Sequence, residues 1–175
     1  MSEPTPKDPV DRLVDAYEAM LERVHTSAEG VEKRTLPWLT EALADAKEKA
    51  VELGELTREE ADKISIYVER DIHEAAGFIA ETGKEFKDWL RFDIGLLQDR
   101  MLDMLAGMAD HTSEALREIA DRAREASIYR TGEITSPGML ECVACGELLH
   151  FDKTGHIPPC PKCHATEYKR PPHNS

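Results

Sequence analysis

Two pairs of closely spaced cysteines constrain the fold of this chain more than any other feature. Cys142 and Cys145 form the first pair, Cys160 and Cys163 form the second, and 14 residues separate the two pairs. Two intervening residues allow a tight turn to direct both sulfurs of a pair at one ion, and two such turns complete a tetrahedron. The spacing therefore predicts one Zn²⁺ site with all four cysteines as ligands.

The residues around the cysteines indicate a small antiparallel sheet. Gly146 follows the first turn, where a left-handed backbone is common, and Pro161 fixes a backbone angle inside the second turn. Short strands are expected over residues 132–135, 139–142, 148–151 and 167–170. Together these features predict a β zinc ribbon. A segment this short has a small apolar core, so the metal is expected to supply much of its folding free energy.

Other uses of four cysteines were weighed against a structural zinc site. Two disulfides would suit a secreted protein, but nothing else in the sequence suggests export. Iron also accepts four tetrahedral sulfurs, but the short separation of the pairs and the few aromatic residues nearby favour zinc. His164 stands where a glycine would usually follow the second turn, and it is expected at the surface and not as a ligand. Four protein ligands leave no place for a metal-bound water, so the site is expected to be structural.

Charge and composition divide the chain near residue 130. The 175 residues have a formal net charge of -13, but residues 1–129 hold 17 Lys and Arg against 30 Asp and Glu, while residues 130–175 hold five of each sign. We therefore expect an acidic helical domain over 1–129 and a zinc ribbon domain over 130–175. An acidic body is a poor ligand for nucleic acid, whose binding depends on neutralising phosphates. No apolar run is long enough to span a membrane and the first ten residues do not resemble a signal peptide, so a cytoplasmic location without membrane contact is expected.

The first domain carries helical apolar patterns. One stripe repeats at steps of three and four residues and consists of Val10, Leu13, Val14, Tyr17, Met20, Leu21 and Val24. A second stripe consists of Leu36, Leu39, Leu43, Ala46, Ala50 and Leu53. Such spacing places apolar side chains on one face of an α-helix. The second helix is expected to begin near Pro37 and to end at Gly54.

A third helical pattern follows a capping box formed by Thr57 and Glu60. From Ala61 the apolar positions recur at helical spacing, namely Ile64, Val68, Ile72, Ala75, Ile79, Phe86, Leu90, Leu97, Met101, Met104, Met108, Leu116 and Ile119. Gly83 and the segment 110–113, which begins with Asp110, are expected to break or bend this pattern. The predicted fold is mainly α, an antiparallel helical hairpin or bundle with coiled-coil character, followed by the ribbon.

Several segments resemble the bacterial YbeL-like zinc-ribbon-containing family, whose function is unknown. The resemblance lies in residues 129–134, 137–142 and 158–163 of the ribbon and in residues 69–73 and 89–93 of the helical part. It implies a helical amino-terminal region and a carboxy-terminal ribbon whose metal ligands fall on the four cysteines. It implies no activity. His164 departs from the glycine expected there.

Weaker patterns point mostly to structural roles. Glu22 and His25 have the spacing of a di-iron motif, but they flank the apolar stripe, and only one copy of the motif is present. A second group could form buried ion pairs that fix the register of the bundle, or ordinary surface pairs, and it consists of Arg70, Asp71, Glu74, Arg91 and Asp93. Trp89 is expected in the core or at an interface. The methionines of the third pattern are expected in the core, although they could line a groove for a partner.

The expected function is non-enzymatic, because no phosphate-binding loop, catalytic triad or additional cysteine is present. The helices are expected to bind a protein partner or to form a homo-oligomer, with the ribbon as a second recognition surface. The alternative is a regulator that binds nucleic acid or a ribonucleoprotein through Phe151, Tyr168, Lys169 and Arg170. A metal or redox sensor that releases zinc on oxidation is a third possibility.

Overall fold

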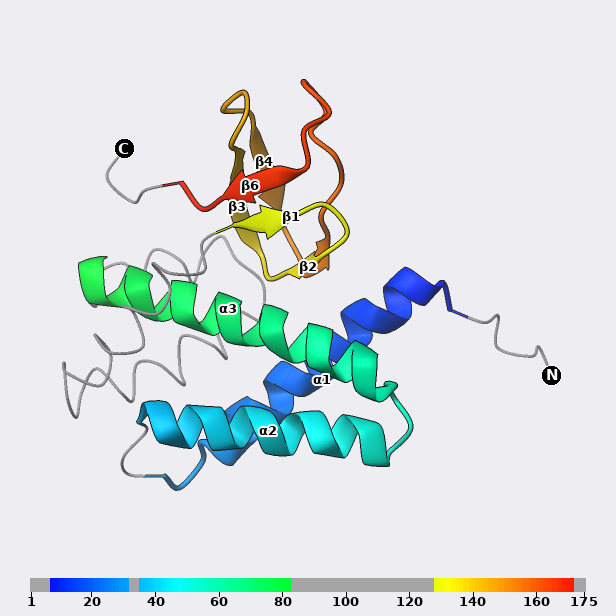
Figure 1. The fold of residues 1–175 in the computed structure, drawn as a ribbon. Coiled ribbons are helices and arrows are strands. Elements are labelled where there is room, and N and C mark those ends of the chain that lie inside the picture. The colour runs from blue at the N-terminus through cyan, green and yellow to red at the C-terminus, as the bar shows by residue number, and fades with distance from the viewer. Residues whose placement is uncertain (1–6, 32–34, 83–127, 172–175) are drawn as a thin grey trace.

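The computed structural model describes residues 7–31, 35–82 and 128–171. Three helices, α1 (Pro9–Ser27), α2 (Leu36–Glu52) and α3 (Arg58–Thr82), precede six short strands. The strands are β1 (Tyr129–Arg130), β2 (Ile134–Thr135), β3 (Gly138–Cys142), β4 (Leu148–Phe151), β5 (Gly155–His156) and β6 (Glu167–Lys169). We call α1 to α3 the helical body and residues 128–171 the ribbon (Figure 1).

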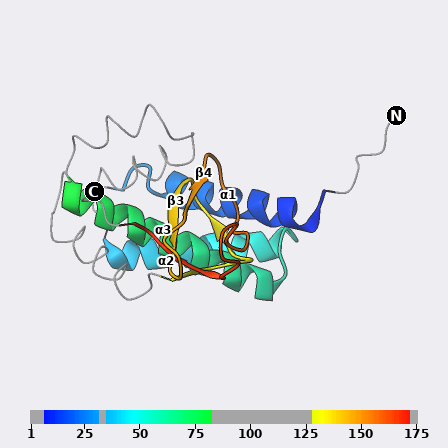
Figure 2. The same ribbon diagram turned by 90° about the horizontal axis from the view of Figure 1, so that it is seen from above.

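The three helices bury their apolar stripes in one another. Neighbouring helices α2 and α3 run in opposite directions, and α1 crosses both of them (Figures 1 and 2). The shared core includes Tyr17, Met20, Leu21 and Val24 of α1, Leu39, Leu43, Ala46 and Ala50 of α2, and Ala61, Ile64, Val68 and Ile72 of α3. These are the positions that the periodicity selects. The apolar stripes of α1, α2 and α3 therefore pack mainly against one another in the core of the helical body.

Each helix begins at a side chain that accepts a backbone hydrogen bond. The Asp8 carboxylate accepts from the amide of Val10 at 2.9 Å, and the Thr35 hydroxyl accepts from the amide of Trp38 at 3.4 Å. These bonds satisfy amides that have no partner within the first turn of a helix.

The predicted capping box at the start of α3 is confirmed. The Thr57 hydroxyl accepts from the Glu60 amide at 3.2 Å, and the Glu60 carboxylate accepts from the Thr57 amide at 2.9 Å. Hydrogen bonds from the Arg12 guanidinium and from that Thr57 amide lower the pKa of Glu60 to about 2. The box thus ties α3 to α1 as well as closing its own first turn.

One member of each of the first two stripes was assigned wrongly. Val10 was expected on the buried face, but it lies in the first turn of α1 and is exposed. Leu53 was expected on the buried face, but it is exposed, because α2 ends at Glu52 and Gly54 turns the chain with φ of 67°. Leu56 packs into the core in its place after the turn. The helical spacing of three and four residues predicts burial only as far as the helix continues. Leu53 lies just after the helix ends, so that spacing no longer applies to it.

The ribbon contains two small antiparallel sheets. The larger has the strand order β1-β6-β3-β4, and the smaller pairs β2 with β5. In the larger sheet Tyr129 lies opposite Tyr168, and Cys142 also lies opposite Tyr168 from the other side. The sequence predicted β2, β3, β4 and β6 but not β1 and β5, two-residue strands that show no alternating pattern of their own.

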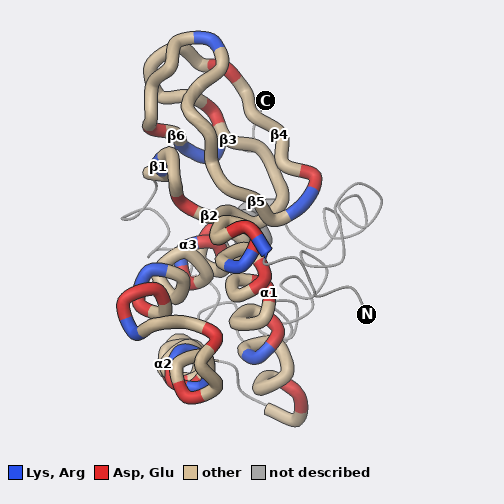
Figure 3. The backbone as a smooth tube through the Cα atoms, turned by 90° about the vertical axis from the view of Figure 1, so that its right-hand side faces the viewer, with Lys and Arg blue, Asp and Glu red and all other residues tan. Residues whose placement is uncertain are grey.

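The ribbon packs on α1 and α3 through β2 and β5, on the side of the body opposite α2 (Figure 3). Ile134 of β2 joins the apolar core of the body. The turn between β3 and β4 and the segment between β5 and β6 lie at the end of the ribbon remote from the helices (Figure 1). The ribbon therefore has a base on the body and a tip that points away from it.

The described residues confirm the predicted mainly α fold with a carboxy-terminal antiparallel ribbon. Coiled-coil character and the division into domains at residue 130 stay predictions. The breaks expected at Gly83 and Asp110, and the apolar positions from Phe86 to Ile119, lie outside the described residues. None of the described helices is both long and apolar enough to cross a membrane.

Replacing Thr57 by Ala should lower the free energy of unfolding by about 1 kcal/mol, because the Glu60 amide loses its acceptor. Thr57→Ser keeps the hydroxyl and should unfold close to wild type. Urea titrations followed by far-ultraviolet circular dichroism measure both variants. Equal midpoints for the Ala and Ser variants would show that the box contributes no stability.

Candidate metal centre

The four predicted cysteines come together at the tip of the ribbon. All four sulfurs lie within 4.8 Å of one another, and the Sγ atoms of Cys142 and Cys163 and of Cys145 and Cys160 are each 3.6 Å apart. Cys142 and Cys160 are buried, Cys145 is half-buried and Cys163 is exposed. The expected clustering of these residues is confirmed.

These sulfur distances fit a tetrahedral metal site and not a disulfide. Zinc bound to sulfur at about 2.3 Å would place tetrahedral ligands about 3.8 Å apart, whereas bonded sulfurs lie about 2.05 Å apart. The four sulfurs converge from two turns, with no other described His, Cys, Asp or Glu joining the cluster. The donor set of four thiols is one that zinc binds in structural sites.

The two turns repeat one hydrogen-bond pattern. In the first, the Cys142 amide donates to the carbonyl of Glu147 at 2.8 Å and the Gly146 amide donates to the carbonyl of Cys142 at 2.9 Å. In the second, the Cys160 amide donates to the carbonyl of Ala165 and the His164 amide donates to the carbonyl of Cys160, both at 2.9 Å. Each Cys-x2-Cys segment therefore folds into the same local structure.

Backbone amides direct their hydrogens at the sulfurs. Donation from the amides of Cys163 and Lys162 lowers the pKa of the Cys160 thiol to about 7, against the effect of burial. Backbone donors also reach Cys145 from Glu147 and Cys163 from Ala165, but burial and hydrogen bonds among the four thiols leave the pKa of Cys145 and of Cys163 raised. Such donors stabilise the thiolate, which is the form of cysteine that binds a metal.

His164 takes the backbone conformation that a glycine would take. Its φ is 60°, and the equivalent Gly146 in the first turn has φ of 76°. His164 is exposed, as expected, and the metal cluster does not include it. The replacement of glycine by histidine thus leaves the turn geometry unchanged and places a side chain in the left-handed region, which carries a steric cost.

Aromatic residues lie closer to the centre than the sequence suggested. Tyr129 and Tyr168 are fully buried and share the ribbon core with Cys142 and Cys160. The Tyr168 hydroxyl donates to the carbonyl of Pro158 at 2.8 Å, and burial raises the pKa of Tyr168 to about 12. Zinc was favoured over iron partly because few aromatic residues were expected near the cysteines. The two buried tyrosines remove that reason.

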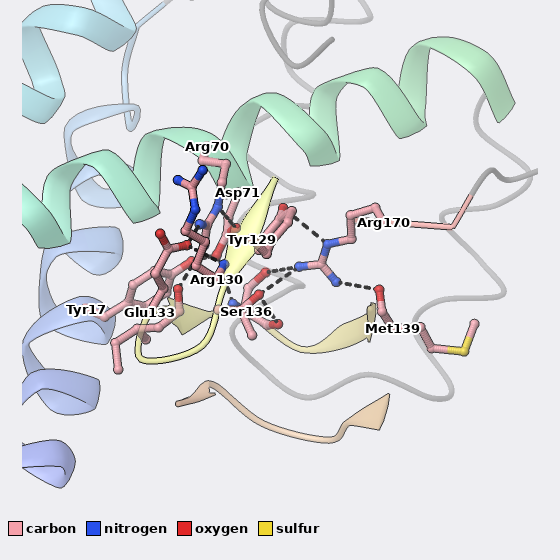
Figure 4. Close-up of polar contacts among 11 residues, drawn as sticks. Tyr17, Arg70, Asp71, Tyr129, Arg130, Glu133, Ser136, Met139 and Arg170 are labelled. Carbon is pink, nitrogen blue, oxygen red and sulfur yellow. Dashed lines mark hydrogen bonds and ion pairs between the residues drawn. The ribbon is translucent and has the colours of Figure 1, made fainter. Parts of the chain in front are cut away.

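A buried polar cluster fixes the base of the ribbon to the helices (Figure 4). We call it the anchor cluster, and it consists of Tyr17, Arg70, Asp71, Glu133 and Ser136. The Asp71 carboxylate accepts from the Tyr17 hydroxyl at 2.5 Å and from the Ser136 amide at 2.9 Å. Arg70 pairs with Asp71 and with Glu133 and donates to the carbonyl of Ile134 at 3.0 Å. Glu133, the Ile134 carbonyl and the Ser136 amide come from the ribbon, so docking of the ribbon adds three polar partners to a pair of charges that also contact each other on α3.

Tyr129 lies between two guanidinium groups next to this cluster. The Arg70 guanidinium lies 3.8 Å and the Arg170 guanidinium 5.1 Å from the centre of the Tyr129 ring. Arg170 also donates to the Tyr129 hydroxyl at 3.3 Å and to Thr135, Ser136 and Met139. Gly138 has φ of 138°, a conformation that residues with a side chain rarely adopt, and a Cβ there would also displace the Arg170 guanidinium. Burial raises the pKa of Tyr129, so the phenol stays neutral.

The structure uses two of the residues suggested for nucleic acid in other ways. Tyr168 is fully buried, and the Arg170 guanidinium is bonded within the ribbon base. Phe151 is half-buried, and Lys169 lies within 4.0 Å of Glu141. The alternative of nucleic-acid binding stays a prediction, with fewer of its residues available at the surface.

The other candidate residues are placed as follows. Glu22 and His25 are half-buried beside the α1 stripe and are not in a metal cluster of the described residues. Arg70 and Asp71 form buried ion pairs, as one of the two interpretations held, although they join the ribbon to a helix and not two helices. Glu74 is half-buried. Trp89, Arg91, Asp93, Met101, Met104 and Met108 lie outside the described residues.

Sequence reasoning missed Tyr17, Glu133 and Ser136 as members of one cluster. Tyr17 belongs to an apolar stripe and carries the one hydroxyl of that stripe. A buried tyrosine usually finds a partner for its hydroxyl, and this could have indicated a polar contact. No local pattern indicates that the partner lies on another helix.

Comparison with known proteins agrees with the geometry. The profile of a family described as a zinc-ribbon containing domain matches residues 26–172. Uncharacterized protein YbeL of Escherichia coli strain K12 is 30% identical over 131 residues, which cover 73% of this chain and 78% of that protein. The proteins of the same name from strains O6:H1 and O157:H7 match to the same extent. No solved structure matches the chain.

Replacing Tyr17 by Phe should lower the free energy of unfolding by about 2 kcal/mol, because Asp71 stays buried and loses a hydrogen bond to its charge. Tyr67→Phe is the matched control, since Tyr67 is a half-buried tyrosine on the helix that carries Asp71. Thermal unfolding of the zinc-loaded protein measures both. If Tyr17→Phe and Tyr67→Phe lower the stability equally, the hydrogen bond from Tyr17 to Asp71 does not account for the loss.

Substitutions at His164 should rank by their tolerance of a positive φ. His164→Gly should stabilise the ribbon by up to about 1 kcal/mol, and His164→Val should destabilise it by about 1 kcal/mol, since a β-branched residue resists this conformation most. His164→Asn should resemble wild type. Competition with a zinc chelator gives the metal affinity of each variant. If His164→Val binds zinc as tightly as His164→Gly, or more tightly, the positive φ at this position does not limit the stability of the ribbon.

Proposed function

The chain belongs to the zinc-ribbon containing family, and we propose that it is a non-enzymatic zinc-binding protein that acts by association with other protein chains. The observation that carries the zinc-binding part of the proposal is the convergence of four thiols from two equivalent turns. The protein is proposed to act in the cytoplasm, where thiols stay reduced and available to a metal.

In this proposal Cys142, Cys145, Cys160 and Cys163 hold one zinc ion. When bound, the ion links the two turns and supplies folding free energy, which in zinc-finger peptides is about 10–16 kcal/mol. The ribbon needs such a contribution because its buried core has few members, namely Tyr129, Leu140, Cys142, Ile157, Cys160 and Tyr168.

The ligand set supports a structural role for the metal. Catalytic zinc sites keep one coordination position for water or substrate, and structural sites fill all four with protein ligands. Here each of the four sulfurs lies within 4.8 Å of the others, so all four can reach one ion. A role in binding other molecules is therefore better supported than a role in catalysis.

The proposed mode of action is self-association or the binding of a protein partner by the helices, with the ribbon as a second surface. The helical body supplies outward faces rich in charge, because its apolar stripes are buried. The ribbon supplies a rigid tip that projects from the body (Figure 1). Neither surface requires a chemical step.

The proposal is tested with Cys142→Ser, compared with Val143→Ser as a matched control in the same turn. Val143 is exposed and is not a ligand, so its variant should keep an equimolar amount of zinc. Cys142→Ser should lose zinc affinity by more than about 100-fold, since even changes outside the ligand shell cost 10–100-fold. Metal analysis after dialysis measures both.

The same pair of variants tests association. A protein partner recovered with wild type and with Val143→Ser, but lost with Cys142→Ser, would assign binding to the metal-supported ribbon. Equal zinc content in all three proteins would contradict the metal site. Equal partner recovery by all three would contradict a role for the ribbon in binding.

A further inference from the structure

One segment of the ribbon, residues 129–136, takes part both in the contact with the helices and in the sheets that carry the cysteine turns. We call it the docking segment. Toward the helices, Glu133 of this segment pairs with Arg70, and the Ser136 amide donates to the Asp71 carboxylate at 2.9 Å (Figure 4). The docking segment therefore supplies ribbon partners to both buried charges of α3.

The same segment is bonded to both stems of the second cysteine turn. Before the turn, the Gly132 amide donates to the carbonyl of Ile157, and the Ile157 amide donates to the carbonyl of Glu133, both at 2.9 Å. After the turn, the carbonyl of Thr166 accepts from the Thr131 amide at 2.9 Å. Both cysteines of that turn lie between these points of attachment, so closing the turn holds the docking segment from two sides.

The first cysteine turn is joined to the docking segment through β6. Cys142 lies opposite Tyr168 of β6, and the Val143 amide donates to the carbonyl of Glu167 at 3.0 Å. On its other side β6 pairs with β1, which is the first part of the docking segment. Both cysteine turns therefore reach the docking segment through one network of backbone hydrogen bonds.

The apolar packing that holds the two turns together is limited. The buried core of the ribbon has six members, and two of them, Cys142 and Cys160, are themselves proposed ligands. A core of this size is seldom stable without a metal or a comparable link. Loss of the metal is therefore expected to loosen the stems that hold the docking segment in place.

We propose that metal binding at the tip and docking at the base are coupled, so that loss of zinc releases the docking segment from α1 and α3. Release uncovers Arg70, Asp71 and the part of the apolar core now filled by Ile134. The metal-loaded ribbon is thus a cover over one face of the helical body, and the metal controls it. The inference rests on the proposed function, since it requires that the four cysteines hold zinc.

Coupling of this kind acts in both directions. If zinc favours docking by a given factor, docking favours the binding of zinc by the same factor. A change on α3 that weakens docking must then weaken the binding of zinc, although no described residue of α3 belongs to the metal cluster. A ribbon that folds independently would bind zinc equally well whether or not it is docked.

The first test measures the zinc affinity of full-length variants by competition with a chelator. Arg70→Gln should bind zinc at least about fivefold more weakly than wild type, because Glu133 and the carbonyl of Ile134 lose their donor, and couplings between two sites are roughly 5–150-fold. Thr57→Ala is the matched control, since it weakens the start of the same helix through a bond that does not involve the ribbon. It should keep the wild-type affinity.

The second test uses wild type alone, and it decides the question if Arg70→Gln loses its helices. Hydrogen exchange is followed in the zinc-loaded chain and after removal of zinc by a chelator. Removal should speed exchange in α3 around Arg70 more than in α2, because α3 contacts the ribbon and α2 lies on the opposite side of the body (Figure 3).

Three results would overturn the proposal. Equal zinc affinity in wild type and Arg70→Gln would show that the ribbon binds metal independently of docking. Equal weakening by Arg70→Gln and Thr57→Ala would assign the effect to the general stability of the body. Unchanged exchange around Arg70 after zinc removal would show that docking survives without the metal. All three leave zinc binding in place, whereas a wild-type chain that binds no zinc contradicts the proposed function itself.

Discussion

The burial of two opposite charges on α3 is the constraint on which the arrangement of the molecule depends. Arg70 is 7% exposed and Asp71 is 2% exposed. A charge taken out of water costs several kcal/mol unless partners compensate it. The two charges pair with each other, the Tyr17 hydroxyl of α1 donates to Asp71, and the ribbon adds Glu133, the Ser136 amide and the carbonyl of Ile134. Separating the ribbon from the helical body would leave these buried groups without three of their partners, so the anchor cluster favours the docked arrangement although the two parts differ sharply in composition.

The ribbon is stabilised at its two ends by different interactions. At the tip, four thiols converge and suit a metal ion. At the base, ion pairs and hydrogen bonds join it to α1 and α3. A small apolar core connects the two ends, since Tyr129 contacts the guanidinium groups of the base and packs in the same cluster as Cys142 and Cys160. Such a core is too small to act alone, which explains why both ends carry strong polar interactions.

Patterns among residues close in sequence predicted the helices and the cysteine cluster. They did not predict the contacts between residues that are far apart in sequence. The stripe from Leu13 to Val24, the capping box of Thr57 and Glu60, and the convergence of the cysteines each depend on residues close in sequence, where spacing is informative. The docking of Glu133 on Arg70 joins positions 63 residues apart, and no period relates them. The conformation of His164 shows a related limit, because a tightly bonded turn imposed a positive φ on a residue that rarely adopts it.

The path of the chain through the ribbon has a mechanical consequence. The chain enters at β1 and leaves at Arg170, and these two points lie together at the base, joined by the bond between Arg170 and Tyr129. A pull on the flanking segments would load the β1–β6 pair and the anchor cluster before any force reached the tip. The thiols therefore sit in a loop that is shielded from tension in the rest of the protein.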